Sequence, residues 1–388
     1  LAVLPFDNLS GDADQEHVAD GFTEDLITVL SQIGDLFVIA RNSTFTYKGR
    51  AVKVQQVAED LGVRYVLEGS VQRAGGRLRI NAQLIDAVSG RHLWAERYDR
   101  DAADLFAIQD DITDRIATAL SVKLTAGQDA RVFRGQTKNL EAWNLLGRGL
   151  KDFYTFGKTE THHARELFRQ AIELDPNYAA AYLMLAWTHW FDAQNGWSED
   201  RRASLVKTAK LAAEAHALND RLAGVYALKG AILLRQGLHE AAVAAGEKAV
   251  SLDSNQATNM ALLGVFLANA GRPGEAIGRF KRAMRLSPYY PAWFLENLGY
   301  AYLDAQQYDN AIAALDKFLE RQPGRQSAAR AQIGQALAFS AQGFEAKARA
   351  AIAQALESDP DIDQSYWRQG SLNKNRAGLE LVIEKLGR

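Results

Sequence analysis

Side chains that could bind a metal ion occur at two places in the sequence. The stretch GDADQEH at 11–17 has the acidic spacing of a calcium-binding loop, but it lacks the glycine at the sixth position and the closing bidentate glutamate. His162, His163 and Glu166 form the second group, yet neighbouring histidines on a helix point to different sides. A metal is therefore not expected at 11–17, and a solvated or capping role is favoured for the histidines.

Motifs of several enzyme classes are absent from the sequence. It contains no Walker A spacing, no dinucleotide glycine fingerprint, no HExxH zinc pair and no GxSxG elbow. Because there is no cysteine, thiolate catalysis, disulfides and cysteine metal sites are excluded. The sequence predicts a chain with no catalytic residues and no cofactor.

Composition narrows the class of protein further. The chain has 388 residues, 47% of them apolar and 24% charged, which is typical of a soluble globular protein with two or three domains. A net charge of -2 gives no field that would attract nucleic acid over the whole chain. No run approaches the roughly 20 apolar residues of a membrane span. We expect a cytoplasmic protein with no membrane segment in this chain.

A basic face is the one local feature that could attract nucleic acid. Arg64, Arg73, Arg77 and Arg79 fall in or beside two predicted strands. No aromatic residue alternates with these arginines, so bases would have nothing to stack on. We interpret this face as the solvated side of a half-buried sheet and expect no nucleic-acid partner.

Residues 1–124 predict an α+β domain. Apolar residues at spacings of three and four predict helices that end at Gly34 and Gly62 and a trailing amphipathic helix at 104–120. Alternation of apolar and polar residues in RLRINAQLID, between two turns, predicts the middle strand of a three-stranded antiparallel meander. Further short strands are expected at 1–6 and 36–40, with a polar loop at 41–50.

The rest of the chain repeats one phrase. AIELDPNYAAAY recurs in altered form five times, with anchor positions at Pro176, Asp220, Ser254, Pro288, Pro323 and Pro360. The intervals are 44, 34, 34, 35 and 37 residues, and a period near 34 is that of tetratricopeptide helix pairs. We predict an all-α solenoid of about six repeats at 140–362, preceded by a linker at 125–139 and followed by a capping helix at 363–388. Loop insertions are expected in the first two repeats.

Stacked helix pairs build a concave groove lined by their first helices, and this groove is the predicted binding site for a protein or peptide. Counting by helical spacing predicts an apolar and aromatic lining with one basic end. The lining residues are Asn144, Arg148, Lys151, Leu183, Trp187, Trp190, Leu234, Val265, Trp293, Glu296 and Tyr300. An alternative of equal weight is that the groove is filled within the chain, by the 104–120 helix or by tight superhelical closure.

Several phrases carry a resemblance to a known family. LAVLPFDNLSGD, LFVIARNSTFTYKGR and VAEDLGVRYVLEGSVQRAGGRLRINAQLIDAVSGRHLWAERYDRD resemble the TolB-like domain that is joined to tetratricopeptide repeats in alphaproteobacterial signalling proteins. The likeness is greatest to the carboxy-terminal half of rhizobial class III adenylate/guanylate cyclases. There the catalytic domain lies upstream, so the resemblance implies a regulatory, protein-binding region with an effector domain in cis.

Two functional hypotheses follow. The first is a non-catalytic regulatory region attached to a nucleotide cyclase. The resemblance to the class III cyclases implies a homodimer, although the residues alone reveal no self-complementary patch. The alternative is small-ligand sensing, for example of a nucleotide, near DNLSGD and RNSTFTYKG, in a chain attached to a winged-helix regulator or a kinase. Because the sequence begins on Leu1 within a predicted core strand, we expect a further domain before it.

Overall fold

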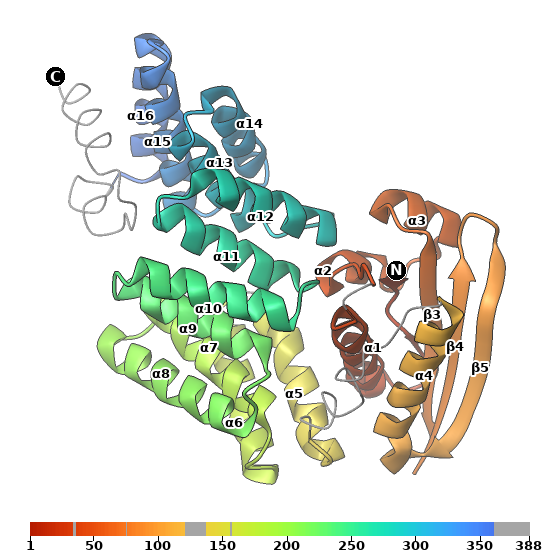
Figure 1. The fold of residues 1–388 in the computed structure, drawn as a ribbon. Coiled ribbons are helices and arrows are strands. Elements are labelled where there is room, and N and C mark those ends of the chain that lie inside the picture. Colours follow the sequence, from red (N-terminus) through yellow and green to blue (C-terminus); the bar gives the residue numbers. More distant parts are fainter. Residues whose placement is uncertain (34–35, 75, 121–136, 156, 361–388) are drawn as a thin grey trace. The chain divides into compact units, whose positions relative to one another are not determined.

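The structure is a computed structural model that describes residues 1–33, 36–74, 76–120, 137–155 and 157–360 (Figure 1). Contacts within the chain divide it into two compact units. Unit 1 comprises Leu1–Lys229, Lys248–Gln256 and Leu286–Pro288, and unit 2 comprises Gly230–Glu247, Ala257–Arg285 and Tyr289–Arg388. Unit 1 thus contains the amino-terminal domain, the first repeat helices and two turns from later in the chain.

A five-stranded sheet forms the centre of the amino-terminal domain. Its strands are β1 (Ala2–Val3), β2 (Asp7–Asn8), β3 (Tyr65–Ala74), β4 (Arg77–Asp86) and β5 (Arg91–Asp101). β3, β4 and β5 form the predicted antiparallel meander, while β1 and β2 both pair in parallel with β3. Leu78 and Ile80 on β4 are buried, as the alternation predicted. β5 is the outermost strand of the sheet (Figure 1).

Helices α1 (Glu16–Ser31) and α4 (Leu105–Ala119) cover one face of this sheet, and α3 (Val54–Leu61) covers one end of the other face. The domain also contains α2 (Arg41–Thr44) and short 3-10 turns at Ala13–Gln15, Phe45–Tyr47 and Ala102–Asp104. Phe22 of α1 and Ile112 of α4 share one core cluster with Leu67 of β3. Val66 and the residues of α3 form a second cluster, because neighbouring strand residues point to opposite faces. The predicted α+β plan is therefore present.

Two local predictions in this domain were wrong. Residues 36–40 are extended but do not form a sheet strand. The amino group of Leu1 donates to the carbonyl of Phe37 at 2.7 Å, and the N–H of Ile39 donates to the carbonyl of Leu1 at 2.9 Å. The N–H of Ala40 donates to the carbonyl of Leu286 at 2.7 Å instead, so the pairing with Leu1 does not continue as a ladder. The expected polar loop at 41–50 contains α2 and a 3-10 turn, and the hydroxyl of Ser43 meets that of Ser287 at 3.1 Å.

Helices alone make up the described part of the chain after residue 137. They are α5 (Leu140–Phe153), α6 (Lys158–Leu174), α7 (Ala179–Asn195), α8 (Arg201–Leu218), α9 (Ala223–Arg235), α10 (His239–Leu252), α11 (Ala257–Asn269), α12 (Pro273–Leu286), α13 (Trp293–Asp304), α14 (Tyr308–Leu319), α15 (Arg325–Ala341) and α16 (Glu345–Ser358). Consecutive helices form pairs joined by short turns (Figure 1). Five of the six predicted anchor positions fall in the turns between pairs, and Pro360 follows α16 at the end of the described residues.

Small residues allow the two helices of a pair to approach closely. A Cβ atom on Gly149 of α5 would lie 2.4 Å from the ring of Phe168 on α6, which no real contact allows. Gly264 and Phe280 repeat this arrangement in the α11 and α12 pair, where the distance would be 3.0 Å. A side chain at Gly149 would therefore collide with the facing aromatic ring, while one at Gly264 would require that ring to move by a few tenths of an ångström.

The expected insertion in the second repeat does not form a long loop. The extra residues lengthen both helices of the second repeat instead. Helices α7 and α8 have 17 and 18 residues, whereas α9 and α10 of the next repeat have 13 and 14. Gly196, at φ 66°, ends α7 in the left-handed conformation that glycine adopts most readily. The added turn of α7 carries Asp192 and Ala193, which are both buried.

The proposed domain boundaries stay predictions. Most of the predicted linker at 125–139 and all of the predicted cap at 363–388 lie outside the described residues. Of the linker, Asn139 is described, and it caps α5: its side-chain oxygen accepts hydrogen bonds from the N–H groups of Glu141 and Ala142.

Candidate functional site

The first repeat helix is joined to the α+β domain through Trp143. This residue of α5 is 3% exposed and belongs to the same core cluster as Phe22. Its indole Nε1–H donates to Oδ2 of Asp25 on α1 at 2.7 Å, and the Nε2 of Gln109 on α4 donates to the same oxygen at 3.1 Å. Helix α5 is therefore part of the repeat array and part of the α+β core.

Asp25 has an altered acidity in this joint. Loss of hydration raises its pKa from 3.8 to about 7; the bonds from Trp143 and Gln109 oppose the rise, and the charge of Glu24 adds to it. Both donors use Oδ2, so Oδ1 is the oxygen left to hold a proton. Close by, burial raises the pKa of Tyr178, and its hydroxyl has no hydrogen-bond partner among the described residues.

Helix α1 approaches α5 closely, and at Gly21 a side chain would collide with the ring of Trp143. A Cβ on Gly21 of α1 would lie 2.9 Å from Cζ2 of Trp143, and a Cβ on Gly147 of α5 would lie 3.6 Å from the carbonyl oxygen of His17. From α4, the ring of Phe106 packs edge-on against Trp143 with centroids 6.3 Å apart. The face of the first repeat helix that carries Gly147 is thus covered within the chain by α1, which the sequence had not indicated.

An ion pair extends this joint. Arg41 of α2 pairs with Glu24 of α1 at 3.0 Å, and the hydroxyl of Tyr154, just after α5, donates to Glu24 at 3.1 Å. The guanidinium of Arg41 lies over two rings, with its Cζ 3.9 Å from the centroid of Phe45 and 4.8 Å from that of Tyr154. Partly buried contacts of this kind are stronger than the same contacts in water.

Two turns from later in the chain also bind the α+β domain within unit 1. The hydroxyl of Ser31 at the end of α1 is 3.1 Å from both carboxylate oxygens of Asp253, and the side-chain amide of Asn255 donates to the carbonyls of Ser31 and Leu36 at 2.9 and 2.7 Å. Burial raises the pKa of Asp253 to about 6. The turns that the sequence marked as repeat punctuation thus also hold the neighbouring domain.

The predicted groove residues differ in exposure. Leu183, Trp190 and Leu234 are buried, and Glu296 is 9% exposed and pairs with Arg330 at 2.9 Å. Burial assigns these four to packing inside the array. The amide oxygen of Asn144 is buried and has no partner among the described residues. Exposed or half-buried members are Arg148, Lys151, Trp187, Val265, Trp293 and Tyr300. Contact of a partner with this second set stays a prediction.

Trp187 belongs to an aromatic cluster of unit 1. Its ring packs edge-on against Trp190 with centroids 6.5 Å apart, and it lies 6.3 Å from the ring of Phe191. Phe153 of α5 packs against Phe191 at 5.3 Å. Because Trp187 is only half-buried, part of its apolar ring remains accessible to solvent.

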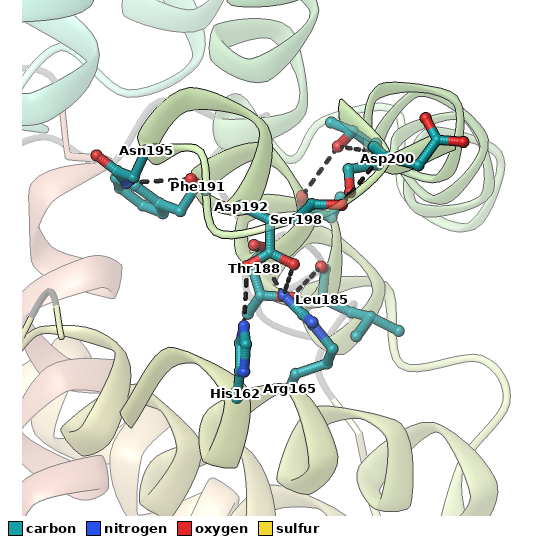
Figure 2. Close-up of polar contacts among 12 residues, drawn as sticks. His162, Arg165, Leu185, Thr188, Phe191, Asp192, Asn195, Ser198 and Asp200 are labelled. Atoms are coloured by element: carbon teal, nitrogen blue, oxygen red, sulfur yellow. Dashed lines mark hydrogen bonds and ion pairs between the residues drawn. The ribbon is translucent and has the colours of Figure 1, made fainter. Parts of the chain in front are cut away.

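The histidines that could have bound a metal are separated by their partners (Figure 2). Asp192, buried in α7, accepts from Arg165 of α6 at 2.7 Å and lies 3.1 Å from Nε2 of His162. His163 lies 2.6 Å from Asp152 instead. Arg165 also donates to the hydroxyl oxygen and the carbonyl of Thr188, so it binds the first helix pair to the second (Figure 2). No group of three metal-ligating side chains occurs in the described ranges.

We predict that Arg165→Met lowers the free energy of unfolding by about 1–3 kcal/mol, because it leaves the buried carboxylate of Asp192 without its main donor. Hydrogen exchange of α6 and α7 measures the effect. Arg169→Met is the matched control: Arg169 is exposed on the same helix and pairs only with Glu166, so the change is expected within about 0.5 kcal/mol. Equal effects of the two variants would disprove this role for Arg165.

Three of the four arginines of the basic face pair with carboxylates of the same chain. Asp99 of β5 accepts from Arg77 at 2.9 Å and from Arg79 at 2.7 Å, and these two arginines lower its pKa. Arg64 pairs with Asp86 at 2.7 Å. These pairs fit the interpretation as a solvated sheet face.

Polar groups in the two loops of the ligand-sensing alternative contact other parts of the protein. The side-chain oxygen of Asn8 accepts from the N–H of Ser10, whose hydroxyl oxygen accepts from the N–H of Arg73. In the second loop Arg41 and Ser43 make the contacts described above. These bonds stabilise the domain itself.

Comparison with known proteins identifies tetratricopeptide repeats in the carboxy-terminal region. Models of the repeat match residues 223–256 and 267–333. Residues 1–117 match the second domain of HilA/YgeH-like transcriptional regulators, so this match does not show the TolB-like resemblance. The fold thus defines a two-part protein with a small α+β domain and a repeat array, and the repeat is a non-catalytic fold that mediates contacts between proteins.

A relative is found in Rhizobium meliloti (strain 1021), where it is named "Putative adenylate cyclase 3". It is 48% identical to this chain over 215 residues, which is 55% of this chain and 37% of the relative. The aligned part therefore spans little more than a third of that protein.

Solved structures with a similar arrangement are repeat proteins. YrrB, described as a TPR protein with an unusual peptide-binding site, has a TM-score of 0.37 and 20% identity, covering 50% of this chain and 93% of its own. The Cut9–Hcn1 complex of APC/C has a TM-score of 0.48 and 16% identity, covering 70% of this chain and 56% of its own. PilF of Pseudomonas aeruginosa has a TM-score of 0.43 and 18% identity, covering 57% of this chain and 94% of its own. The repeat assignment rests on the family matches and the helix pairs.

Sequence reasoning missed the residues of the joint. The sequence indicated no functional role for Trp143, Asp25, Gln109 or Asn255. The available signal was a carboxylate at position 25 that shares a helix face with the apolar Phe22 and Val29, three residues before and four residues after it. Among the described residues, no helix is both long enough and apolar enough to cross a membrane.

Proposed function

We propose that this chain is the non-catalytic regulatory region of a nucleotide cyclase, in which the repeats bind a protein or peptide and the α+β domain relays that binding to a catalytic domain in cis. The relative named as an adenylate cyclase supports the link to a cyclase, and the repeat matches support protein binding. A cytoplasmic location belongs to the same proposal, as does the TolB-like character of the first domain.

The observation that carries the proposal is the shared helix α5. Because Trp143 lies in the α+β core while the helix opens the repeat array, a displacement of α5 by a partner would be felt at Asp25 and Gln109. A relay needs such a physical connection between the binding surface and the domain next to the effector. No observation favours small-ligand sensing in the same way, since the polar groups of its two loops are used within the protein.

Partner binding is tested with the exposed groove residues. We expect Lys151→Glu combined with Trp187→Ala to lower capture of the proteins bound from a rhizobial lysate by at least about tenfold, because it removes a charge and an aromatic anchor. Mass spectrometry identifies which proteins are lost. Lys210→Glu with Val206→Ala is the matched control, since both residues are exposed on α8. Equal capture by the two double variants would contradict groove binding.

The link to a cyclase is tested separately. The reading frame around this sequence is expressed as the complete protein, and formation of cyclic nucleotide from ATP or GTP is measured with and without the captured partner. A complete protein that forms no cyclic nucleotide would disprove the cyclase link and leave partner binding standing.

A further inference from the structure

Strand β5 has one backbone edge that is unpaired among the described residues. β4 pairs along its other edge, and β5 is the last strand of the sheet (Figure 1). The strand runs for 11 residues, and apart from Tyr98 none of them is fully buried. A long unpaired edge is a place where a further strand can add through main-chain hydrogen bonds.

The hydrogen bonds of the hairpin show which backbone groups face this free edge. The N–H of Ala102 donates to the carbonyl of Gly76, so the backbone of Ala102 points toward β4. Backbone groups alternate in direction along a strand, so those of Arg97 and Asp99 point away from β4. The N–H groups of Arg97 and Asp99 and the carbonyl of Arg97 therefore lie at the free edge, where the carbonyl of Asp99 also accepts long bonds of 3.4 Å from the side chains of Arg77 and Arg100.

The regular part of the edge is limited at both ends. The register with β4 shifts between Leu84 and Ile85, next to His92 and Trp94, and the 3-10 turn Ala102–Asp104 follows the strand. A bulge bends the strand and interrupts pairing. The segment that can accept another strand is thus 94–101.

We propose that β5 pairs antiparallel with β5 of a second copy of this chain, about a two-fold axis at Tyr98. This register places Glu96 opposite the partner's Arg100 and Arg97 opposite the partner's Asp99, and symmetry repeats both pairs. Opposite charges in facing positions stabilise a strand pair, and the same surface on both subunits is the usual form of a dimer interface.

Other registers are less favourable. An axis at Glu96, Arg97 or Asp99 would place that charged residue opposite itself. An axis at Ala95 would bring the bulge beside His92 into the ladder. The axis at Tyr98 avoids both, so the charge pattern of the edge selects one arrangement, and the sheets of the two copies become one continuous sheet.

The charges of the edge already have some partners within the chain. Glu96 lies 3.9 Å from Arg115 and accepts from the indole of Trp94, while the guanidinium of Arg100 donates to the carbonyl of Asp99. Asp99 pairs with Arg77 and Arg79 of β4 and lies 3.6 Å from Arg97 of its own strand, so Glu96 and Arg100 are better positions for charge reversal. The proposal depends neither on the cyclase nor on the repeat groove.

The test is the oligomeric state of the 388-residue chain, measured by sedimentation over a range of concentrations. The wild-type chain is expected to dimerise. Glu96→Arg and Arg100→Glu each create two facing pairs of like charge, so each alone is expected to raise the dimer dissociation constant by about tenfold or more. Mixed together, the two variants recover opposite charges at both positions and are expected to form a heterodimer of near wild-type affinity.

Arg91→Glu is the matched control, because Arg91 is exposed on the same strand but lies beyond the bulge. It is expected to leave the dissociation constant unchanged. Circular dichroism verifies that each variant is folded. A chain that is monomeric throughout, a dimer that neither reversal weakens, or variants that fail to associate on mixing would each overturn the proposal.

Discussion

Trp143→Ala is expected to destabilise unit 1 by about 3–5 kcal/mol, because it removes a large buried side chain from the cluster that joins α5 to the α+β domain. It also takes one of two donors from the carboxyl group of Asp25. Hydrogen exchange measured by mass spectrometry follows each element separately, and α1, α4 and α5 should lose protection together.

Two further variants separate the causes of that effect. Trp143→Phe keeps an aromatic ring in the joint but lacks the N–H, so its cost should fall to about 1–3 kcal/mol. Trp187→Ala removes a half-buried ring from α7 and should leave protection of α1 unchanged. If α1 kept its protection in Trp143→Ala, the joint would not couple the two parts, and the proposed relay would be wrong.

Asp25→Asn is expected to increase stability at pH 8 by roughly 2–4 kcal/mol relative to the wild type, and to have little effect near pH 4. The pKa of Asp25 is about 7 in the folded protein and 3.8 without its environment. Between these values the folded state binds more protons than the unfolded state, so its contribution to stability falls as the pH rises. An asparagine carries no charge and has no such loss.

The geometry of the joint makes asparagine a suitable replacement. The bonds from Trp143 and Gln109 both end on one oxygen of Asp25, so an amide carbonyl can accept them. Other groups titrate in this range, among them Asp253, with a raised pKa of about 6, and His189, whose pKa burial lowers to about 4. The difference between variant and wild type, measured by denaturant unfolding from pH 4 to 8, removes their contribution. A difference that stays constant with pH would contradict the prediction.

Patterns with a short period were sufficient to predict most elements of this fold. The alternation in RLRINAQLID predicted β4, and Gly62 marked the end of α3. Prediction failed at 36–40, where an apolar run that resembles a strand bonds to Leu1 and Leu286. Such partners are distant in the sequence, and composition carries no information about them.

The candidate site was less predictable than the fold. Helical spacing placed Trp187 and Trp190 on one surface, but one of them is half-buried and the other is buried. Spacing tells which residues share a face of one helix, and the neighbouring helices decide how much of that face remains exposed.

By itself the sequence determined that the second part of this protein is a repeat of helix pairs, that the first part has a meander, and that the motifs of several enzyme classes are absent. These properties depend on residue types at spacings of two to about 34 positions. Only the tertiary structure decided that Trp143 contacts Asp25, which is 118 positions away, and that Ser31 contacts Asp253, 222 positions away. The physical reason is that burial, pKa and the free edge of β5 are properties of assembled surfaces, and these surfaces form only when distant segments pack together.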